Sequence, residues 1–373
     1  MKGLRKYIAP FAPDQSGAAA VLCELGGMVI ILDAGGCAGN ICGFDEPRWF
    51  TEKSAMFSAG LRDMDAILGR DDRLVEKIVK ACRKMQCNFI AVIGTPVPSV
   101  IGTDYRALKK MIEKQTGYPA VMVETNGMEL YDAGIEKALL EIFKTFTEDR
   151  EGFPITGRVG ILGATPLDIP AEKDGWNKNK AYGSSASDIG LPSYGDRIRQ
   201  YYQKRGFKEV FCYGLGSDFP EIAEAAGCEK NFVIAPAALP AARYLKKKYG
   251  IPFETGYPLE ILPGWDQLSE DLADIQNARI LIVHQQMLAN ALREYLVQGK
   301  KHDPEIVVAS WFGMDKEFMK EQDICIKEEE QWANLVRTGD FDLVIGDELF
   351  FKALPESDIR RMNLNHFAVS GHR

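Results

Sequence analysis

Two cysteines in a glycine-rich stretch are the residues best suited to chemistry in this sequence. Cys37 and Cys42 lie within residues 33–43, directly after the apolar run at residues 28–32. If that run is a buried strand, the loop lies at the carboxyl end of a parallel sheet, where open α/β sheets bind ligands. Small neighbours let a bulky inorganic group approach the backbone, and two thiolates at this spacing can reach one iron–sulfur cluster. From the spacing alone, two cysteines in a glycine-rich loop are more often incidental than ligands.

The six other cysteines fall in helix or strand patterns and are predicted to be buried apolar residues, a prediction that is weakest for the first of them: Cys23, Cys82, Cys87, Cys212, Cys228 and Cys325. The chain has no run of about 18 uncharged apolar residues. Its first residues also lack the apolar core of a secretory signal. We therefore expect a cytoplasmic protein without a membrane span, whose thiols stay reduced and are available to metals.

The charge balance argues against nucleic acid as the main partner. The 373 residues include 45 Lys and Arg against 53 Asp and Glu, which leaves a formal net charge of −8. Neutralising phosphates requires clustered basic residues. The short basic runs at residues 109–110 and 246–248 are instead expected to be solvated helix faces.

Motifs for nucleotide binding are missing. No Gly-x-x-x-x-Gly-Lys-Ser/Thr loop is present, so this chain is not expected to hydrolyse ATP itself. Gly214 and Gly216 begin a dinucleotide-binding fingerprint, but Phe219 stands where its third glycine belongs. We expect no nucleotide bound by this chain, so its chemistry must come from another group.

His284 is a candidate catalytic residue because it follows the predicted strand at residues 279–283 and is expected to face a cleft between two layers. There it could donate a proton or bind a substrate metal, although a surface histidine is the simpler interpretation. Trp311 and Phe312 end another strand on the same side. They are expected in the core, with the walls of a flat apolar pocket as the alternative.

Short apolar runs alternate with helical patterns along the whole chain. The runs are continuous, as is typical of parallel strands covered by helices on both faces. They lie at residues 28–32, 89–93, 120–123, 158–162, 209–213, 231–234, 279–283, 305–310, 324–326 and 342–345. We expect an α/β fold of three Rossmann-like layers, each a parallel sheet flanked by helices. Their predicted limits are residues 1–156, 157–273 and 274–373.

The segment at residues 165–192 is polar and much longer than the median connection of about 4–6 residues. It is either an ordinary surface loop or a lid or docking loop beside a site.

Several motifs, in this order, resemble those of nitrogenase component 1 type oxidoreductases. Residues 12–20 are similar to the family's Pro-x-x-Gly-Ala stretch, and residues 32–37 are similar to its His-Gly-x-x-Gly-Cys motif. Residues 95–104 resemble Cys-x-x-x-x-Ile-Gly-Asp-Asp. Residues 231–252 end in Tyr-Gly-Ile-Pro, like the corresponding family helix, and residues 341–346 resemble a carboxy-terminal family strand. The resemblance covers nearly the whole chain.

The sequence also departs from the family pattern at positions that usually bind metal. Family members that bind a cluster between subunits usually supply three ligands per chain, near Phe11 or Ala12, at Cys37, and near Thr95 or Pro96. Of these positions only Cys37 holds a thiol. The cysteine that binds the molybdenum cofactor of nitrogenase falls near an alanine, Ala235, so nitrogen fixation is disfavoured.

The resemblance implies a 4Fe–4S cluster at a subunit interface. Cys37 and Cys42 would bind its metal, with Gly36 and Gly102 allowing close approach, while Asp104 is expected to cap the helix that follows. Two copies would supply four thiolates, or a paralogous subunit would supply the missing ones.

The implied function is the catalytic component of a two-component, ATP-dependent iron–sulfur reductase. A separate protein similar to the nitrogenase iron protein would deliver electrons to it. The substrate would be a small molecule or a tetrapyrrole, not N2. The alternative is a metal-cluster assembly scaffold or binding protein of the same fold without its own catalysis.

Overall fold

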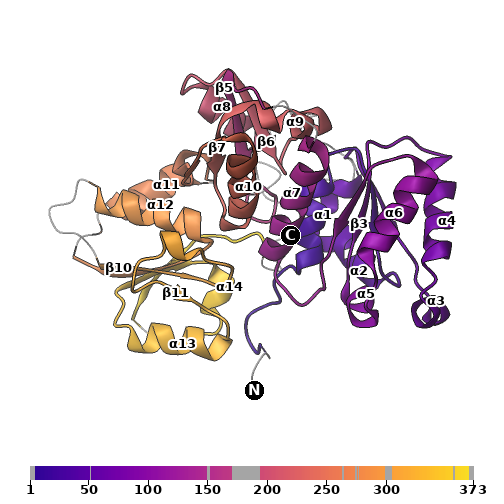
Figure 1. Ribbon diagram of the computed structural model, residues 1–373. Helices are drawn as coiled ribbons and strands as arrows, with labels where there is room; N and C mark the ends of the chain where they lie inside the picture. The colour runs from indigo at the N-terminus through magenta and orange to yellow at the C-terminus, as the bar shows by residue number, and fades with distance from the viewer. Residues whose placement is uncertain are drawn as a thin grey trace.

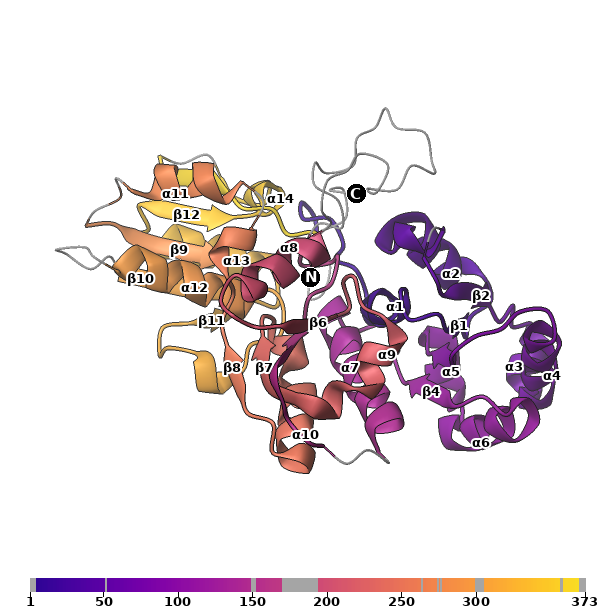
Figure 2. The same cartoon turned by 90° about the horizontal axis from the view of Figure 1, so that it is seen from above.

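The computed structural model contains three parallel β-sheets, each covered by helices (Figure 1). It describes residues 5–50, 52–148, 152–169, 194–262, 264–273, 275, 277–298, 305–355 and 358–368. The long segment singled out in the sequence lies outside these residues from position 170 onward. The predicted three-layer α/β fold is confirmed. Viewed from above, the second layer lies between the first and the third (Figure 2).

The first sheet has the order β2-β1-β3-β4. Its strands are β1 (Met28–Ile31), β2 (Ala55–Ser58), β3 (Ile90–Ile93) and β4 (Ala120–Val123). The helices of this layer are α1 (Asp14–Leu22), α2 (Gly36–Asn40), α3 (Asp63–Leu68), α4 (Asp71–Cys82), α5 (Pro96–Ile101), α6 (Tyr105–Thr116) and α7 (Tyr131–Thr147). Strands β1, β3 and β4 are buried along their whole length, as continuous apolar runs predict.

The second sheet has the order β6-β5-β7-β8 and the third β11-β10-β9-β12-β13. The second contains β5 (Ile155–Leu162), β6 (Glu209–Tyr213), β7 (Cys228–Val233) and β8 (Phe253–Thr255), with α8 (Tyr194–Gln203), α9 (Phe219–Ala223), α10 (Leu239–Tyr249) and α11 (Trp265–Ala273). The third contains β9 (Arg279–Val283), β10 (Glu305–Ser310), β11 (Ile324–Cys325), β12 (Leu343–Gly346) and β13 (Arg360–Asn363), with α12 (Gln286–Val297), α13 (Glu329–Thr338) and α14 (Glu348–Phe351).

Three strands, β2, β8 and β13, were not predicted from the sequence. Each lies at a sheet edge and is half-exposed or exposed over most of its length. Because these three strands are partly exposed, they need no continuous apolar run. The edge strand β4, in contrast, is buried along its length and was predicted.

Helix α7 joins the first two layers because it packs against both α1 and α10 (Figure 1). The backbones of α7 and α1 approach each other closely at two glycines. A Cβ atom on Gly17 would lie 1.8 Å from the carbonyl oxygen of Tyr131, and one on Gly134 would lie 1.7 Å from that of Asp14. Glycine at both positions is therefore required by the spacing of the two helices.

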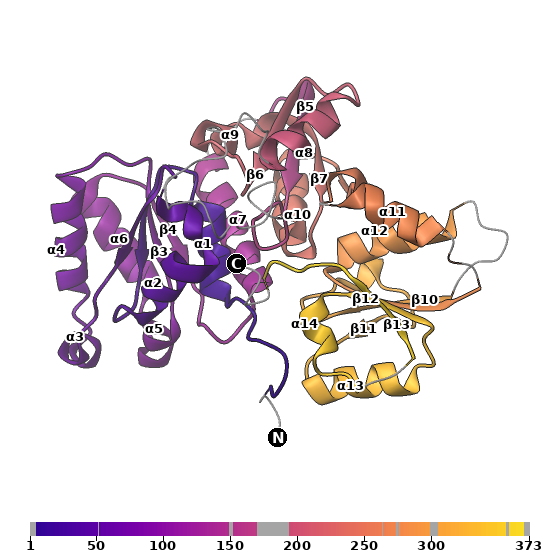
Figure 3. The ribbon, with the colours of Figure 1, turned by 180° about the vertical axis from the view of Figure 1, so that it is seen from behind.

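The carboxy-terminal segment ties the third layer back to the first. After β13 the chain runs towards α1 (Figure 3), and the backbone N–H of Ala12 donates to the carbonyl oxygen of Ala368 at 2.9 Å. No helix in the described part of the chain is long and apolar enough to cross a membrane.

The close contact of α1 and α7 generates a stability prediction. Gly134→Ala should lower the free energy of unfolding by about 2 kcal/mol or more, since the added methyl group overlaps the α1 backbone. Gly39→Ala in α2 is the matched control, because a Cβ there meets no atom within 4 Å. Urea unfolding of both variants checks this, and an unchanged midpoint for Gly134→Ala would contradict it.

Candidate functional site

The cysteine-bearing stretch at the carboxyl end of β1 is mostly helical rather than an irregular loop. It turns at Gly35, whose φ of 125° is open only to glycine, and continues as α2. A π-helical turn, Ile41–Asp45, follows directly. Cys37 therefore lies in the first turn of α2, and Cys42 lies in the π-helical turn.

Two buried carboxylates hold this stretch in place. Asp33 accepts hydrogen bonds from the backbone N–H of Ala38 at 2.8 Å and from the hydroxyl of Ser58 at 2.6 Å. Asp45 accepts from the hydroxyl of Ser16 at 2.7 Å and from the side-chain amide of Asn40 at 2.9 Å. The conformation of the stretch is thus fixed at both ends by contacts to β2 and α1.

The two predicted ligand thiols are half-buried at the surface of this layer. Burial raises the pKa of Cys37, and the nearby Asp33 carboxylate raises it further. Burial also raises the pKa of Cys42, with a further contribution from Glu46. Both thiols are therefore protonated at neutral pH, and a metal would have to displace their protons.

Cys37 and Cys42 could supply half of the ligands of a four-iron cluster, and we call this pair the cluster half-site. No group of three or more His, Cys, Asp or Glu residues in the described chain is placed to hold a metal ion. A four-iron cluster takes four ligands, and this stretch offers two thiols. The surface around them is open, since a Cβ atom on Gly36, Gly39 or Gly43 would meet no atom within 4 Å.

Exposed apolar side chains also lie on other elements at this end of the first sheet. Phe44, next to the stretch, exposes 65% of its surface, and Ile67 on α3 exposes 74%. Val100 on α5 exposes 85%. Helices α3 and α5 are in contact, and α2 and α5 lie at the same end of the sheet (Figures 1 and 3). Such a grouping is typical of a surface that is covered by another chain.

Gly102, the second predicted glycine, ends α5 in the left-handed conformation at φ 69° and donates its N–H to the carbonyl oxygen of Pro98. Asp104 accepts from the backbone N–H groups of Arg106 and Ala107 at 3.0 and 2.9 Å. The predicted helix cap is thus confirmed. At the other end of α5, the hydroxyl of Thr95 donates to the carbonyl oxygen of Leu32 at 2.8 Å, which joins β3 to β1 beside Cys37.

His284 does follow β9, but the prediction that it lies at the surface is wrong, because only 1% of its surface is exposed. Its Nε2 lies 3.1 Å from the carbonyl oxygen of Asn365, so Nε2 carries the proton. Its Nδ1 has no hydrogen-bond partner among the described residues. Burial lowers the pKa of His284 to about 4, so the ring is neutral at pH 7.

His284 belongs to a buried polar junction where all three layers meet. Its ring lies 4.5 Å from that of His366. The Nε2 of His366 faces the hydroxyl of Tyr131 at 3.3 Å, and that hydroxyl donates to Asp168 at 2.6 Å. The backbone N–H of His366 donates to Asp347 at 2.7 Å. The junction therefore combines residues from α7, from the segment after β5, and from the third layer.

Sequence reasoning did not find Tyr131, Asp168 or His366. None of them directly follows a predicted strand, and their positions along the chain span more than two hundred residues. Only the tertiary fold brings them together. Trp311 and Phe312, in contrast, lie in the core as expected, packed in an aromatic cluster with Phe11.

Comparison with known proteins agrees with this arrangement. Among curated proteins, the nitrogenase iron-molybdenum cofactor biosynthesis protein NifE of Methanococcus maripaludis is 24% identical over 202 residues. That match covers 52% of this chain and 36% of the relative, so the chain matches only about a third of that protein's length.

The solved structure of nitrogenase Cp1 at pH 6.5 superimposes with a TM-score of 0.65 at 13% identity, over 98% of this chain and 87% of the other. The same protein at pH 5 gives 0.63 at 13% identity, over 93% and 81%. These likenesses show the fold. The family profile of nitrogenase component 1 type oxidoreductases matches residues 14–280, which is well over half of the sequence. The chain belongs to the nitrogenase component 1 type oxidoreductase family.

Proposed function

We propose that this chain is the catalytic component of a two-component, ATP-dependent iron–sulfur reductase that acts on a small molecule or a tetrapyrrole. The observation that carries the proposal is the unpartnered Nδ1 of His284 inside the three-layer junction. A buried acceptor without a hydrogen bond costs about 1–3 kcal/mol, so a partner in the working state is expected. A substrate group that carries an N–H or O–H would supply the donor that Nδ1 lacks.

The chemistry of the junction fits proton transfer to a reduced substrate. Tyr131, Asp168 and His366 form a connected set of hydrogen-bonding acid and base groups beside His284. The Nδ1 of His366 accepts from the backbone N–H of Ala368 at 3.3 Å. Its proton is therefore on Nε2, which faces Tyr131 and Asp168. Such a set can hold and pass on protons without contact with bulk water.

The cluster half-site supports a subunit that pairs with another chain. Cys37 and Cys42 would each bind iron, and the same residues of a second copy, or cysteines of a paralogous subunit, would complete the four ligands. A bound cluster supplies one-electron transfer, and this chain supplies the position and the burial. The exposed apolar residues beside Cys37 would then lie in the subunit interface.

One observation favours an assembly scaffold as the second candidate. The curated relative is a cofactor biosynthesis protein, and the two thiols here have raised pKa values. Protonated thiols bind a cluster less firmly than thiolates do, which suits transient holding. An assembly scaffold would not need proton transfer at the junction. A substitution at His284 should therefore slow turnover if the chain is a reductase, and should not affect cluster assembly if it is a scaffold.

The half-site generates the first prediction here. Cys37→Ala should remove the iron and acid-labile sulfide that anaerobically prepared protein carries. Cys82→Ala is the matched control, because Cys82 lies on the outer helix α4 and should not affect the iron content. Equal iron in wild-type protein and Cys37→Ala would exclude Cys37 as a ligand.

The apolar surface generates a prediction about assembly. Under reducing, anaerobic conditions, light scattering should give a dimer, or a heterotetramer built from such pairs, with residues 34–43 at or near the interface. Phe44→Glu should shift the protein towards monomer, since it places a charge among buried apolar groups. Phe153→Glu changes an equally exposed phenylalanine of the second layer and should leave the assembly intact. A strict monomer with its cluster bound contradicts this prediction.

Energy coupling generates the third prediction. Product formation should require the partner, ATP and a strong reductant together, because this chain has no phosphate loop of its own. Ser99→Glu on the exposed turn of α5 should slow electron transfer about fivefold or more without unfolding the protein. Gln200→Glu, an exposed change on α8, is the control. Full activity with reductant alone would show that the two-component mechanism is wrong.

The neutral state of His284 generates a prediction about pH. Its pKa is about 4 in the folded chain and about 6.5 when unfolded, so below pH 6.5 the unfolded state binds a proton that the folded state excludes. The free energy of unfolding should therefore fall by about 3 kcal/mol as the pH decreases from 6.5 to 4. His284→Gln should remove this part of the slope. Identical slopes for variant and wild type in chemical unfolding would disprove it.

A further inference from the structure

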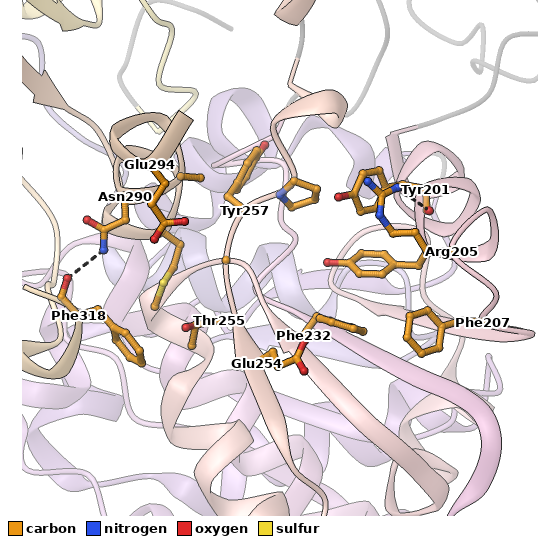
Figure 4. A pocket seen from close by; sticks show the side chains of 15 residues that line it. Tyr201, Arg205, Phe207, Phe232, Glu254, Thr255, Tyr257, Asn290, Glu294 and Phe318 are labelled. Atoms are coloured by element: carbon orange, nitrogen blue, oxygen red, sulfur yellow. Dashed lines mark hydrogen bonds between the residues drawn. The ribbon is translucent and has the colours of Figure 1, made fainter. Parts of the chain in front are cut away.

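A cavity of about 330 Å³ lies between elements of the second and third layers (Figure 4). One wall comes from α8, β7, β8 and the chain that follows each of α8 and β8, and the other from α12 and the turn at Phe318. No lining residue belongs to the cysteine-bearing stretch or to the buried junction. Its volume lies at the lower end of the range for small-molecule sites, about 300–1,000 Å³.

Aromatic rings form the wall on the α8 side. The rings of Tyr202 and Phe232 lie 4.6 Å apart and are tilted by 34°, and Phe207 lies 5.5 Å from Phe232. The guanidinium of Arg205 lies 3.4 Å above the ring of Tyr201. This wall thus already holds one cation, the guanidinium of Arg205, because the negative face of an aromatic ring attracts cations.

The charges around the cavity do not cancel. Arg205 donates to Glu260 at 3.2 Å, and Lys230 to Glu254 at 2.6 Å, so these four charges form two pairs. The fifth charged group is the carboxylate of Glu294 on α12, and no ion pair to it is found within the described part of the chain. It lies across the cavity from Tyr201 and Arg205 (Figure 4). The site therefore has a net negative charge of one.

The wall around Glu294 is held rigidly. Asn290, one turn earlier on α12, donates its side-chain N–H to the carbonyl oxygen of Phe318 at 2.9 Å and accepts from Arg293 at 2.5 Å. Arg293 in turn is paired with the buried Asp323 at 2.7 Å. One N–H and the oxygen of the Asn290 amide are thus engaged within the protein, and Glu294 is the charged residue of α12 that lines the cavity.

We propose that this cavity binds a small organic cation, an amine with a flat or apolar body. The ammonium group pairs with Glu294, and the body lies against the rings of Tyr202 and Phe232. An anion is disfavoured, because Arg205 is already stacked and paired and two carboxylates face the space. The site is independent of the proposed reductase and of the cluster half-site.

Three probes that share one ring but differ in charge test the proposal. They are tyramine, which is a cation, its neutral alcohol analogue tyrosol, and the anion 4-hydroxyphenylacetate. Titration calorimetry of the full chain at pH 7 should show tyramine binding about tenfold more tightly than tyrosol, and no binding of the anion. Tightest binding of the anion, or no binding of any probe, would overturn the proposal.

Three variants test whether tyramine binds in this cavity. Glu294→Gln should weaken tyramine binding about tenfold and make tyramine and tyrosol equal, since only the charge is lost. Ala291→Trp, which fills the space from α12, should abolish binding of both. Glu270→Gln removes an exposed carboxylate of α11 outside the cavity and should change nothing. Unchanged tyramine affinity in Glu294→Gln would show that the cation binds elsewhere.

Discussion

The structure depends on one buried hydrogen-bonded junction at which three separate sheets are joined. His366 contacts all three layers: Tyr131 of the first, Asp168 after β5 of the second, and Asp347 after β12 of the third. Parallel sheets end in polar turns at their carboxyl edges. Here residues that follow β5 and β12 are joined through His366 to Tyr131, the first residue of α7. The layers are therefore positioned by a small polar core as well as by apolar packing.

This arrangement offers the two environments that the proposed reductase would use. The junction is closed to water and keeps His284 neutral, while the cysteine-bearing stretch is open and incomplete. A reductase needs both kinds of environment, since electrons must enter from a partner and protons must reach a protected substrate. The first layer provides the open surface. The junction, to which all three layers contribute, provides the protected environment.

Much of the fold could be predicted from the sequence, because central parallel strands are continuous apolar runs and helices have their own periodicity. The ten predicted strands all exist, whereas β2, β8 and β13 could not be found, since these three edge strands are partly exposed and carry no such run. For the candidate site, Cys37 and its glycines were visible as a local pattern. His284 was predicted at the surface because burial of a single polar residue depends on what covers it, here the returning segment with Asn365 and His366.

The protonated thiols indicate that binding of the proposed cluster and pairing of two chains would be coupled. Burial and Asp33 raise the pKa of Cys37, so an isolated chain offers a thiol rather than a thiolate. Asp33 cannot be exchanged freely, because it also holds α2 through Ala38 and anchors Ser58 of β2. The positive charge of iron must therefore offset both the desolvation and the neighbouring carboxylate. Two chains that meet at this surface would bring four thiols to the same cluster, so pairing and cluster binding should each favour the other.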